Sequence, residues 1–184
     1  MLSNHLTLLC VVPALFVASK ASALLESNTK LFLSAPSFAV VGASNDESKF
    51  GTIVFKAMLE HGMDVVPVNP FVAESHGISC LHSLDDIVDP AHTSISIVTQ
   101  PSVTLQILRQ ASALGIFAVW LQPGAEDDAV LEFIASPNAT ARGTSYIHSA
   151  EALSLEARKS NETPPCLAGD PAKPDLISTL ARRG

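Results

Sequence analysis

Cysteine is scarce in this chain of 184 residues, and its three cysteines lie far apart. Cys10, Cys80 and Cys166 form no Cys-x-x-Cys pair, so the sequence indicates neither a disulfide framework nor a zinc site. The histidines are scattered as well and suggest no metal set. Cys80 and His82 are two residues apart, but no third group is placed to orient them. We therefore predict no catalytic residues and no metal ligands.

Basic residues are also few. The chain holds 11 lysines and arginines against 18 aspartates and glutamates, which gives a formal net charge of -7. A broad nucleic-acid surface needs clustered cations, so nucleic acid is not expected as a partner. A basic membrane-surface patch is not expected either, for the same reason. Hydrophobic residues make up 47% of the chain, which is enough for a sizeable core.

The apolar stretch near the N-terminus is too short to span a bilayer. Leu6–Ala18 has 13 residues, whereas a spanning helix needs about 20. Ala21-Ser22-Ala23 fits a cleavage pattern, but no lysine or arginine precedes the apolar stretch. The segment is compatible with an uncleaved extension, an organellar leader or a cleaved secretory signal. We expect a cytoplasmic protein, with a mitochondrial or a secretory location as the alternatives.

Short β-branched runs alternate with longer helical patterns from residue 37 to about residue 134. The runs predict strands at Ser37–Val41, Val65–Val68, Thr93–Thr99 and Phe117–Leu121. The longer patterns predict helices at Gly51–His61, Ser102–Leu114 and Glu126–Ile134. A short edge strand at Ile78–Leu81 and a brief helix at Leu84–Val88 are expected between them. Strands and helices in this order predict an α/β fold, namely a doubly wound, mainly parallel, Rossmann-like sheet.

The chain divides into three parts on this interpretation. An N-terminal extension or leader covers 1–33, the Rossmann-like domain covers 34–136, and an atypical, partly disordered tail covers 137–184. Within the domain, Trp120 lies in an apolar strand and is expected in the core. Asp127 and Asp128 stand at the start of a helix and are expected to cap it.

Each predicted strand ends in small or polar residues. The four endings are Gly42-Ala43-Ser44, Asn69-Pro70, Thr99-Gln100-Pro101 and Gln122-Pro123-Gly124. Ligands of open parallel sheets bind outside the carboxyl ends of the strands. Gly42 to Ser44 also lead into the helix that Gly51 opens, where backbone N–H groups and the helix dipole favour a phosphate. The sequence therefore predicts a nucleotide or coenzyme site at this edge.

The glycine pattern differs from that of a dinucleotide site. Ala43 and Ser44 replace the middle of the Gly-x-Gly-x-x-Gly fingerprint. An NAD site also places a carboxylate at the end of the second strand, where this chain has Asn69. The missing carboxylate disfavours NAD and leaves room for a ligand with an extra ribose phosphate.

Several blocks of the sequence occur in the order and spacing of a known family. They are Ala39-Val40-Val41-Gly42-Ala43-Ser44, Lys49-Phe50-Gly51, Val66-Pro67-Val68-Asn69-Pro70, Ser83-Leu84 and Val119-Trp120-Leu121-Gln122-Pro123-Gly124. From about Ser34 to Ile134 the chain resembles the coenzyme A-binding domain family of small, stand-alone proteins. These are similar to the N-terminal domain of the succinyl-CoA ligase α subunit.

The resemblance implies a site for coenzyme A or an acyl-CoA. Gly42, Ala43, Ser44 and Gly51 would face the pyrophosphate, and Lys49 would offer charge. Asn69 and Pro70 would border the adenosine. Thr99, Gln100 and Pro101 would line the opposite wall, and Gln122 to Gly124 the exit of the pantetheine arm.

The sequence departs from the family at its end. Only Ser145-Tyr146-Ile147 could serve as the further strand that the family has after the last helix. No part of the chain resembles the phospho-histidine domain of the ligase, so ligase catalysis is not carried over. Two alternatives stay open, an NAD(P)-binding oxidoreductase-like domain and a regulatory module without a ligand. A homo-oligomer or a protein partner also stays open.

Overall fold

The computed structural model describes residues 26–148, and the predictions for the N-terminal segment and most of the tail lie outside these residues. A helix at 26–32 precedes the other elements. These are β1 (Ser37–Val41), α2 (Phe50–Glu60), β2 (Val65–Val68), β3 (Glu74–Ser75), β4 (Ile78–Ser79), the 3-10 helices η1 (Leu84–Asp86) and η2 (Pro90–His92), β5 (Thr93–Ile97), α3 (Pro101–Leu114), β6 (Ala118–Leu121), α4 (Asp128–Ala135) and β7 (Ser145–Ile147). The predicted strands β1, β2, β5 and β6 and the helices α2, α3 and α4 are confirmed, with ends within two residues of those expected.

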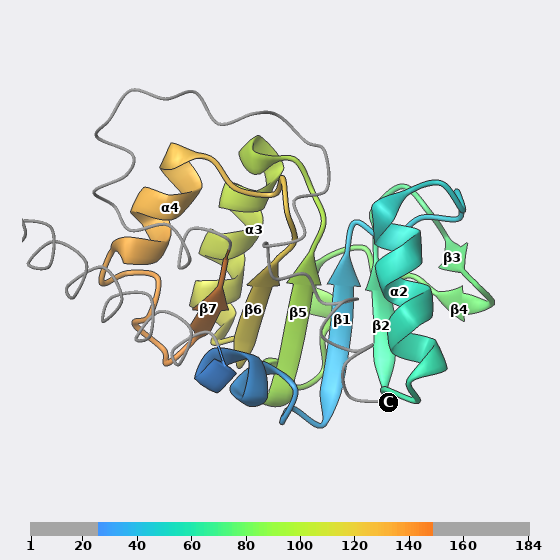
Figure 1. The fold of residues 1–184 in the computed structure, drawn as a ribbon, viewed down its shortest axis with the longest axis horizontal. Helices are drawn as coiled ribbons and strands as arrows, with labels where there is room; N and C mark the ends of the chain where they lie inside the picture. Colours follow the sequence, from blue (N-terminus) through green and yellow to red (C-terminus); the bar gives the residue numbers. More distant parts are fainter. Residues whose placement is uncertain (1–25, 149–184) are drawn as a thin grey trace, which may run out of the picture.

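The sheet has five strands in the order β2-β1-β5-β6-β7, and every pair of neighbours is parallel. The arrowheads of these strands all point to one edge of the domain (Figure 1). The chain moves outward from β1 to β2 and then crosses back to β5, so the strand order reverses between β1 and β5. This is the doubly wound, Rossmann-like α/β fold that the sequence predicted, and ligands of such sheets bind at that reversal.

Helices cover both faces of the sheet. Side chains that alternate along each strand point to opposite faces, and each face carries an apolar cluster that the helices bury. On one face, α2 and the helix at 26–32 pack through Val54, Phe55 and Phe32. The ring of Phe32 meets that of Trp120 edge-on, with the centroids 5.3 Å apart, and Trp120 is fully buried as expected. On the other face, α3 and α4 pack through Leu108 and Val130.

The fifth strand lies beyond the helix at which the sequence analysis ended the domain. Ser145 to Ile147 pair in parallel with Ala118 to Trp120 of β6, so β7 completes the sheet. Tyr146 fixes β7 from the α4 side, since its hydroxyl donates to the carbonyl oxygen of Ala139 at 2.9 Å. Burial raises the pKa of Tyr146 to about 12.

Two short elements differ from the expectation. Of the edge strand expected at Ile78–Leu81, only β4 is a strand, and it pairs with β3 as an antiparallel hairpin outside the main sheet. Leu81 instead forms a single parallel bridge with Val68 at the end of β2. The helix expected at Leu84–Val88 is the 3-10 turn η1, which Ser83 and Asp86 cap reciprocally. The hairpin therefore lies beside α2 at the carboxyl edge of β2 (Figure 1).

Candidate functional site

The candidate site is the edge of the sheet at which β1 and β5 end, where ligands of such sheets bind. Gly42 leaves β1 with a φ of 95°, a conformation that L side chains rarely adopt. A Cβ at Gly42 would also lie 3.3 Å from the Cγ2 of Thr99, the residue at the end of β5. The predicted residues Gly42 and Thr99 therefore face each other at the point where the strand order reverses.

Gly51 brings helix α2 against the turn that follows β1. A Cβ built on Gly51 would collide with the carbonyl oxygen of Gly42, and only glycine allows this approach. Gly51 is itself buried, so its contribution is to let the helix N-terminus approach the turn. Gly51, which the resemblance placed at the pyrophosphate, thus lies directly against the backbone of Gly42.

The turn between Gly42 and Asn45 offers unused hydrogen-bond donors. Among residues 26–148, the N–H groups of Ala43, Ser44 and Asn45 donate to no other group. Ala43 is fully buried, so the donors open to a ligand are those of Ser44 and Asn45. They precede the N-terminus of α2, whose dipole favours negative charge. Free N–H groups at a helix N-terminus form an anion site of the kind that holds phosphates.

The side-chain amide of Asn69 ties the end of β2 to this turn. The Asn69 Nδ2 donates to the carbonyl oxygen of Ala43 at 2.6 Å, and its Oδ1 accepts from the N–H of Phe71 at 2.9 Å. Both ends of the amide are therefore engaged within the protein. Pro70 follows and is exposed.

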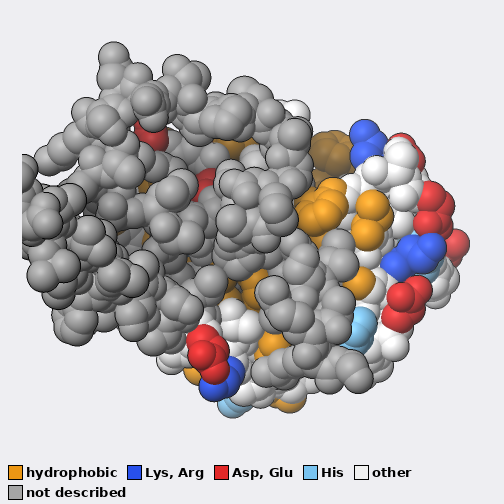
Figure 2. All heavy atoms as spheres, viewed as in Figure 1, with side chains coloured by type: hydrophobic (Ala, Val, Ile, Leu, Met, Phe, Trp, Pro, Cys, Tyr) orange, Lys and Arg blue, Asp and Glu red, His pale blue; other side chains and the backbone are white. Residues whose placement is uncertain are grey.

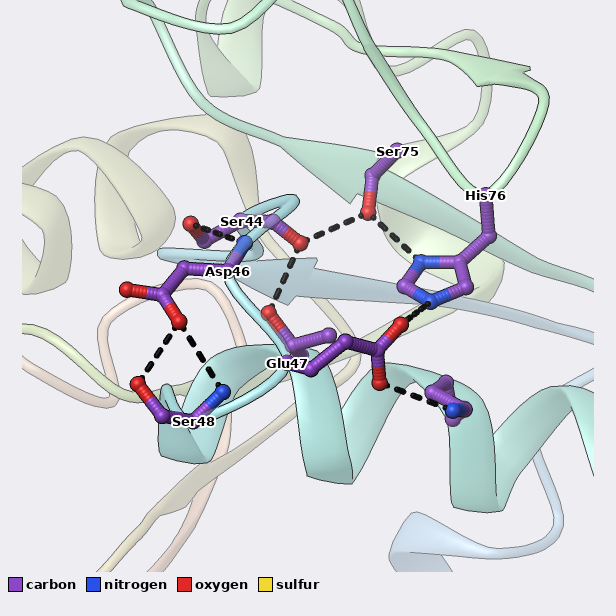
Figure 3. Close-up of polar contacts among 8 residues, drawn as sticks. Ser44, Asp46, Glu47, Ser48, Ser75 and His76 are labelled. Atoms are coloured by element: carbon purple, nitrogen blue, oxygen red, sulfur yellow. Dashed lines mark hydrogen bonds and ion pairs between the residues drawn. The ribbon is translucent and has the colours of Figure 1, made fainter.

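The carbonyl oxygen of Ser44 is held from two sides. It accepts from the hydroxyl of Thr52 on α2 at 2.7 Å and from the hydroxyl of Ser75 on β3 at 3.0 Å. Figure 3 shows both contacts meeting at Ser44. Because the hydroxyls of α2 and of the hairpin meet at one atom, the turn is attached to both elements.

Glu47 links the same loop to the hairpin and to α2 (Figure 3). Its carboxylate accepts from Lys56 Nζ at 2.9 Å and lies 3.1 Å from the Nε2 of His76. The hydrogen bond from Lys56, followed by that from His76, lowers the pKa of Glu47. Asp46 is also engaged, since its Oδ1 accepts from the hydroxyl and the N–H of Ser48, and these bonds lower the pKa of Asp46.

Ser75, His76 and Glu47 stand in series, as in a serine hydrolase triad, with the Nδ1 of His76 3.1 Å from the hydroxyl oxygen of Ser75. Ser75 is fully buried, however, and its hydroxyl donates to the carbonyl of Ser44. A nucleophile must reach its substrate, so this series joins two loops and does not present a reactive serine.

The remaining predicted residues lie along the same edge. Thr99 and Thr104 join their hydroxyls at 2.9 Å at the start of α3, where Gln100 is the exposed N-cap residue and Pro101 opens the helix. Gly124 follows β6 with a φ of 91° and is exposed. Lys49, the N-cap residue of α2, is exposed as well.

Gln122 lies at the end of β6 but its side chain points inward. It is 1% exposed, and its Nε2 donates to the hydroxyl of Ser96 on β5 at 2.9 Å. Beyond it, the Nδ1 of His148 lies 3.9 Å from the Oε2 of Glu126, and both side chains are largely buried. These two residues were not among the predicted site residues.

Exposed apolar side chains near this edge were also missed by the sequence analysis. Phe71, two residues after Asn69, is 92% exposed, and Val103 in the first turn of α3 is 46% exposed. Phe50 and Ile53 at the start of α2 are partly exposed. Figure 2 shows hydrophobic side chains at the surface in the half of the view that α2 occupies, flanked by acidic and basic side chains. The signal in the sequence is an aromatic residue directly after an Asn-Pro turn.

The described part of the chain shows neither a metal centre nor a membrane-spanning helix. Within residues 26–148, no group of three or more His, Cys, Asp or Glu side chains is arranged to hold a metal ion. No helix in that range is both long and apolar enough to cross a lipid bilayer.

Comparison with known proteins identifies the family. The family model of the CoA binding domain matches residues 36–147, and the chain belongs to this family. The chain is 29% identical over 87 residues to an acetate–CoA ligase (ADP-forming) of Methanocaldococcus jannaschii, a match that covers 46% of this chain and 12% of the ligase. The chain thus corresponds to a small part of that curated relative.

Two solved structures resemble the chain over most of their own length. A conserved hypothetical protein from Pyrococcus furiosus is 32% identical with a TM-score of 0.51, and the match covers 62% of this chain and 96% of that one. A hypothetical protein from Pyrococcus horikoshii is 29% identical with a TM-score of 0.58, covering 67% of this chain and 82% of that one. The family match ends at Ile147, the last residue of β7.

Proposed function

We propose that this protein binds coenzyme A or an acyl-CoA at the carboxyl ends of β1 and β5. The observation that carries the proposal is the pair of N–H groups at Ser44 and Asn45, which donate to no other group among residues 26–148 and lie in the turn that leads from β1 to α2. In a CoA-binding domain, these donors suit the pyrophosphate, whose charge the helix dipole also favours. Lys49 supplies a cation at the same helix end.

The two ends of the coenzyme would leave this point in opposite directions. The adenosine would lie beside Pro70 and Phe71 after β2, where an exposed aromatic ring offers a stacking surface. The pantetheine arm would pass Thr99 and Gln100 toward Gly124 after β6. Gln122 supports this path from beneath through its bond to Ser96.

The alternative of an NAD(P)-binding domain has less support. An NAD site uses a carboxylate after the second strand to accept from a ribose hydroxyl. Asn69 stands at that place, and its amide is engaged with Ala43 and Phe71. A regulatory module without a ligand has less support too, because the donors at Ser44 and Asn45 stay unused among residues 26–148.

We propose recognition and no reaction of the protein's own. The serine–histidine–glutamate series is the arrangement most like a catalytic one among residues 26–148, and its serine is buried. Recognition of an intracellular coenzyme agrees with a cytoplasmic or organellar protein.

Isothermal titration of the full chain with coenzyme A, acetyl-CoA, NADPH and ADP tests this function. The proposal expects saturable binding of one molecule of either CoA species per chain, with weaker binding of ADP, which lacks the pantetheine arm. Binding of NADPH without binding of either CoA species would overturn it. Incubation of acetyl-CoA with the protein, followed by a thiol assay, checks the absence of hydrolysis.

A further inference from the structure

The turn of the β3–β4 hairpin holds a histidine in an unfavourable backbone conformation. His76 has a φ of 51° and is followed by Gly77 with a φ of 75°. Two successive residues with positive φ define the turn type that asparagine-glycine fills best in two-residue hairpins. Among residues 26–148, His76 is the sole non-glycine residue with positive φ. Such an outlier suggests that the imidazole has a role that asparagine cannot fill.

Both nitrogens of the imidazole are engaged. Nδ1 lies 3.1 Å from the Ser75 hydroxyl oxygen, and Nε2 lies 3.1 Å from the Glu47 carboxylate. The Ser75 hydroxyl already donates its hydrogen to the Ser44 carbonyl, so its oxygen must accept from Nδ1. The carboxylate must also accept from Nε2. Only the imidazolium donates from both nitrogens, so only the charged ring satisfies the whole series.

The series ends at the peptide that carries one of the free donors. The Ser44 carbonyl and the Asn45 N–H belong to one planar trans peptide and point in opposite directions. The hydroxyls of Ser75 and Thr52 hold the carbonyl toward α2 and the hairpin. The Asn45 N–H is thereby aimed away from them, and it donates to no other group among residues 26–148.

We propose that His76, in its protonated form, is a positioning residue that fixes the Ser44–Asn45 peptide for the coenzyme phosphates. This inference rests on the proposed function. The charged group in contact with the ring is Glu47 from the β1–α2 loop, which also binds Lys56 from α2, and Glu74 stands two residues earlier in the sequence, on β3. Loss of the proton breaks either the contact with Glu47 or the bond to Ser44, so coenzyme binding weakens as the pH rises.

The variant His76→Asn separates positioning from folding. Asparagine suits this turn better than histidine, so the midpoint of urea unfolding should stay the same or rise. Coenzyme A should nevertheless bind about 3- to 10-fold more weakly at low pH, the equivalent of one lost hydrogen bond. Glu47→Gln should also weaken coenzyme A binding at low pH, because it removes the carboxylate that accepts from His76. Glu47 is exposed, so the loss of its charge should not disturb packing.

His92→Asn is the matched control. His92 also pairs with a carboxylate, that of Asp89 at 2.9 Å, but it lies before β5 at the opposite edge of the sheet. Full-length wild type, H76N and H92N are titrated with coenzyme A across about pH 5 to 8, where histidines change charge. Phosphate groups of the coenzyme titrate identically in all three, so the ratio of variant to wild-type Kd isolates the ring.

The expected result is a ratio for H76N of about 3 to 10 at the acid end that approaches one at the alkaline end, and a ratio of one for H92N throughout. Equal affinities of H76N and wild type, or a ratio that does not change with pH, would overturn the inference. If wild type does not bind coenzyme A, the proposed function fails instead. The coupling between the His76 ring and the Ser44–Asn45 peptide is then tested in the free protein. The chemical shift of the Asn45 amide should change over this pH range in wild type and not in H76N.

Discussion

The side-chain amide of Asn69 donates to the carbonyl oxygen of Ala43 at 2.6 Å, which ties the end of β2 to the turn after β1. The position is the one at which an NAD site places a carboxylate. A carboxylate here would face the Ala43 carbonyl and could not donate to it. The residue that disfavours NAD in the sequence therefore also supports the geometry of the candidate site.

Asn69→Asp tests this relationship. We expect the free energy of unfolding to fall by about 1–3 kcal/mol, because a carboxylate oxygen would oppose the Ala43 carbonyl. Coenzyme A binding should weaken as the turn loosens. Urea unfolding and calorimetry measure the two effects, with Asn138→Asp, at an exposed position, as the control. Tighter binding of NADH by N69D, without loss of stability, would instead favour a dinucleotide site.

Gly51→Ala tests the close approach of α2 to the turn. The added methyl would collide with the Gly42 carbonyl oxygen, and overpacking of this kind costs about 1–3 kcal/mol of stability. Coenzyme A binding should fall as well, because the helix N-terminus moves away from the free donors. Gly62→Ala is the control: Gly62 has positive φ but open space around it, so only the backbone penalty of about 1–2 kcal/mol applies and coenzyme binding should not change. Equal stability and equal affinity of the two variants would contradict the account of Gly51.

Phe71→Ala tests the adenosine end. Phe71 is 92% exposed, so its removal should leave the free energy of unfolding within about 0.5 kcal/mol. The Kd for coenzyme A should rise about 2- to 10-fold if the ring stacks on the base. Val88→Ala, at a fully exposed residue near the amino edge of β5, should change neither quantity. An unchanged Kd for F71A would remove the adenosine from this side of the site.

Tyr146 makes a prediction about alkaline pH. It is the single tyrosine of the chain, so the absorbance of tyrosinate reports it alone. Burial raises its pKa to about 12 in the folded protein, whereas a tyrosine in the unfolded chain titrates near about 10. The unfolded chain therefore loses its proton first, and the free energy of unfolding falls as the pH rises from about 10 toward 12. A midpoint near 10 while the fluorescence of Trp120 stays native would contradict the burial of β7.

The sequence predicted the main elements because their signals are local. Gly42 and Gly51 bracket a turn and a helix start, and Gly115 ends α3 with a φ of 72°, as glycine does at helix ends. The strand β4 was expected within Ile78–Leu81, but β3 and the pairing of the two as a hairpin were missed, because β3 has two residues and is too short for any periodicity. The turn of the hairpin is His76-Gly77. Glycine at the second position is typical of such turns, but the first position usually holds asparagine, so the pair was not recognised as a hairpin turn.

The predicted site residues lie at one edge of the sheet, and their roles toward a coenzyme stay predictions. Gly42 and Thr99 lie together where the strand order reverses, which the sequence did not indicate. Gln122 shows what a sequence pattern cannot separate. A polar residue at a strand end indicated a ligand contact, but all residues of β6 are buried, and Gln122 directly after them is buried too, with its amide donating to Ser96.

The most direct test is a map of backbone amide resonances of the full chain as coenzyme A is added. The account predicts the largest shifts at the amides of Ala43, Ser44 and Asn45, with smaller ones at Phe71 and Gln100, and none near His92 at the opposite edge. Saturable shifts centred on the amino edge of the sheet, or saturation with coenzyme A that leaves residues 43–45 unchanged, would contradict it.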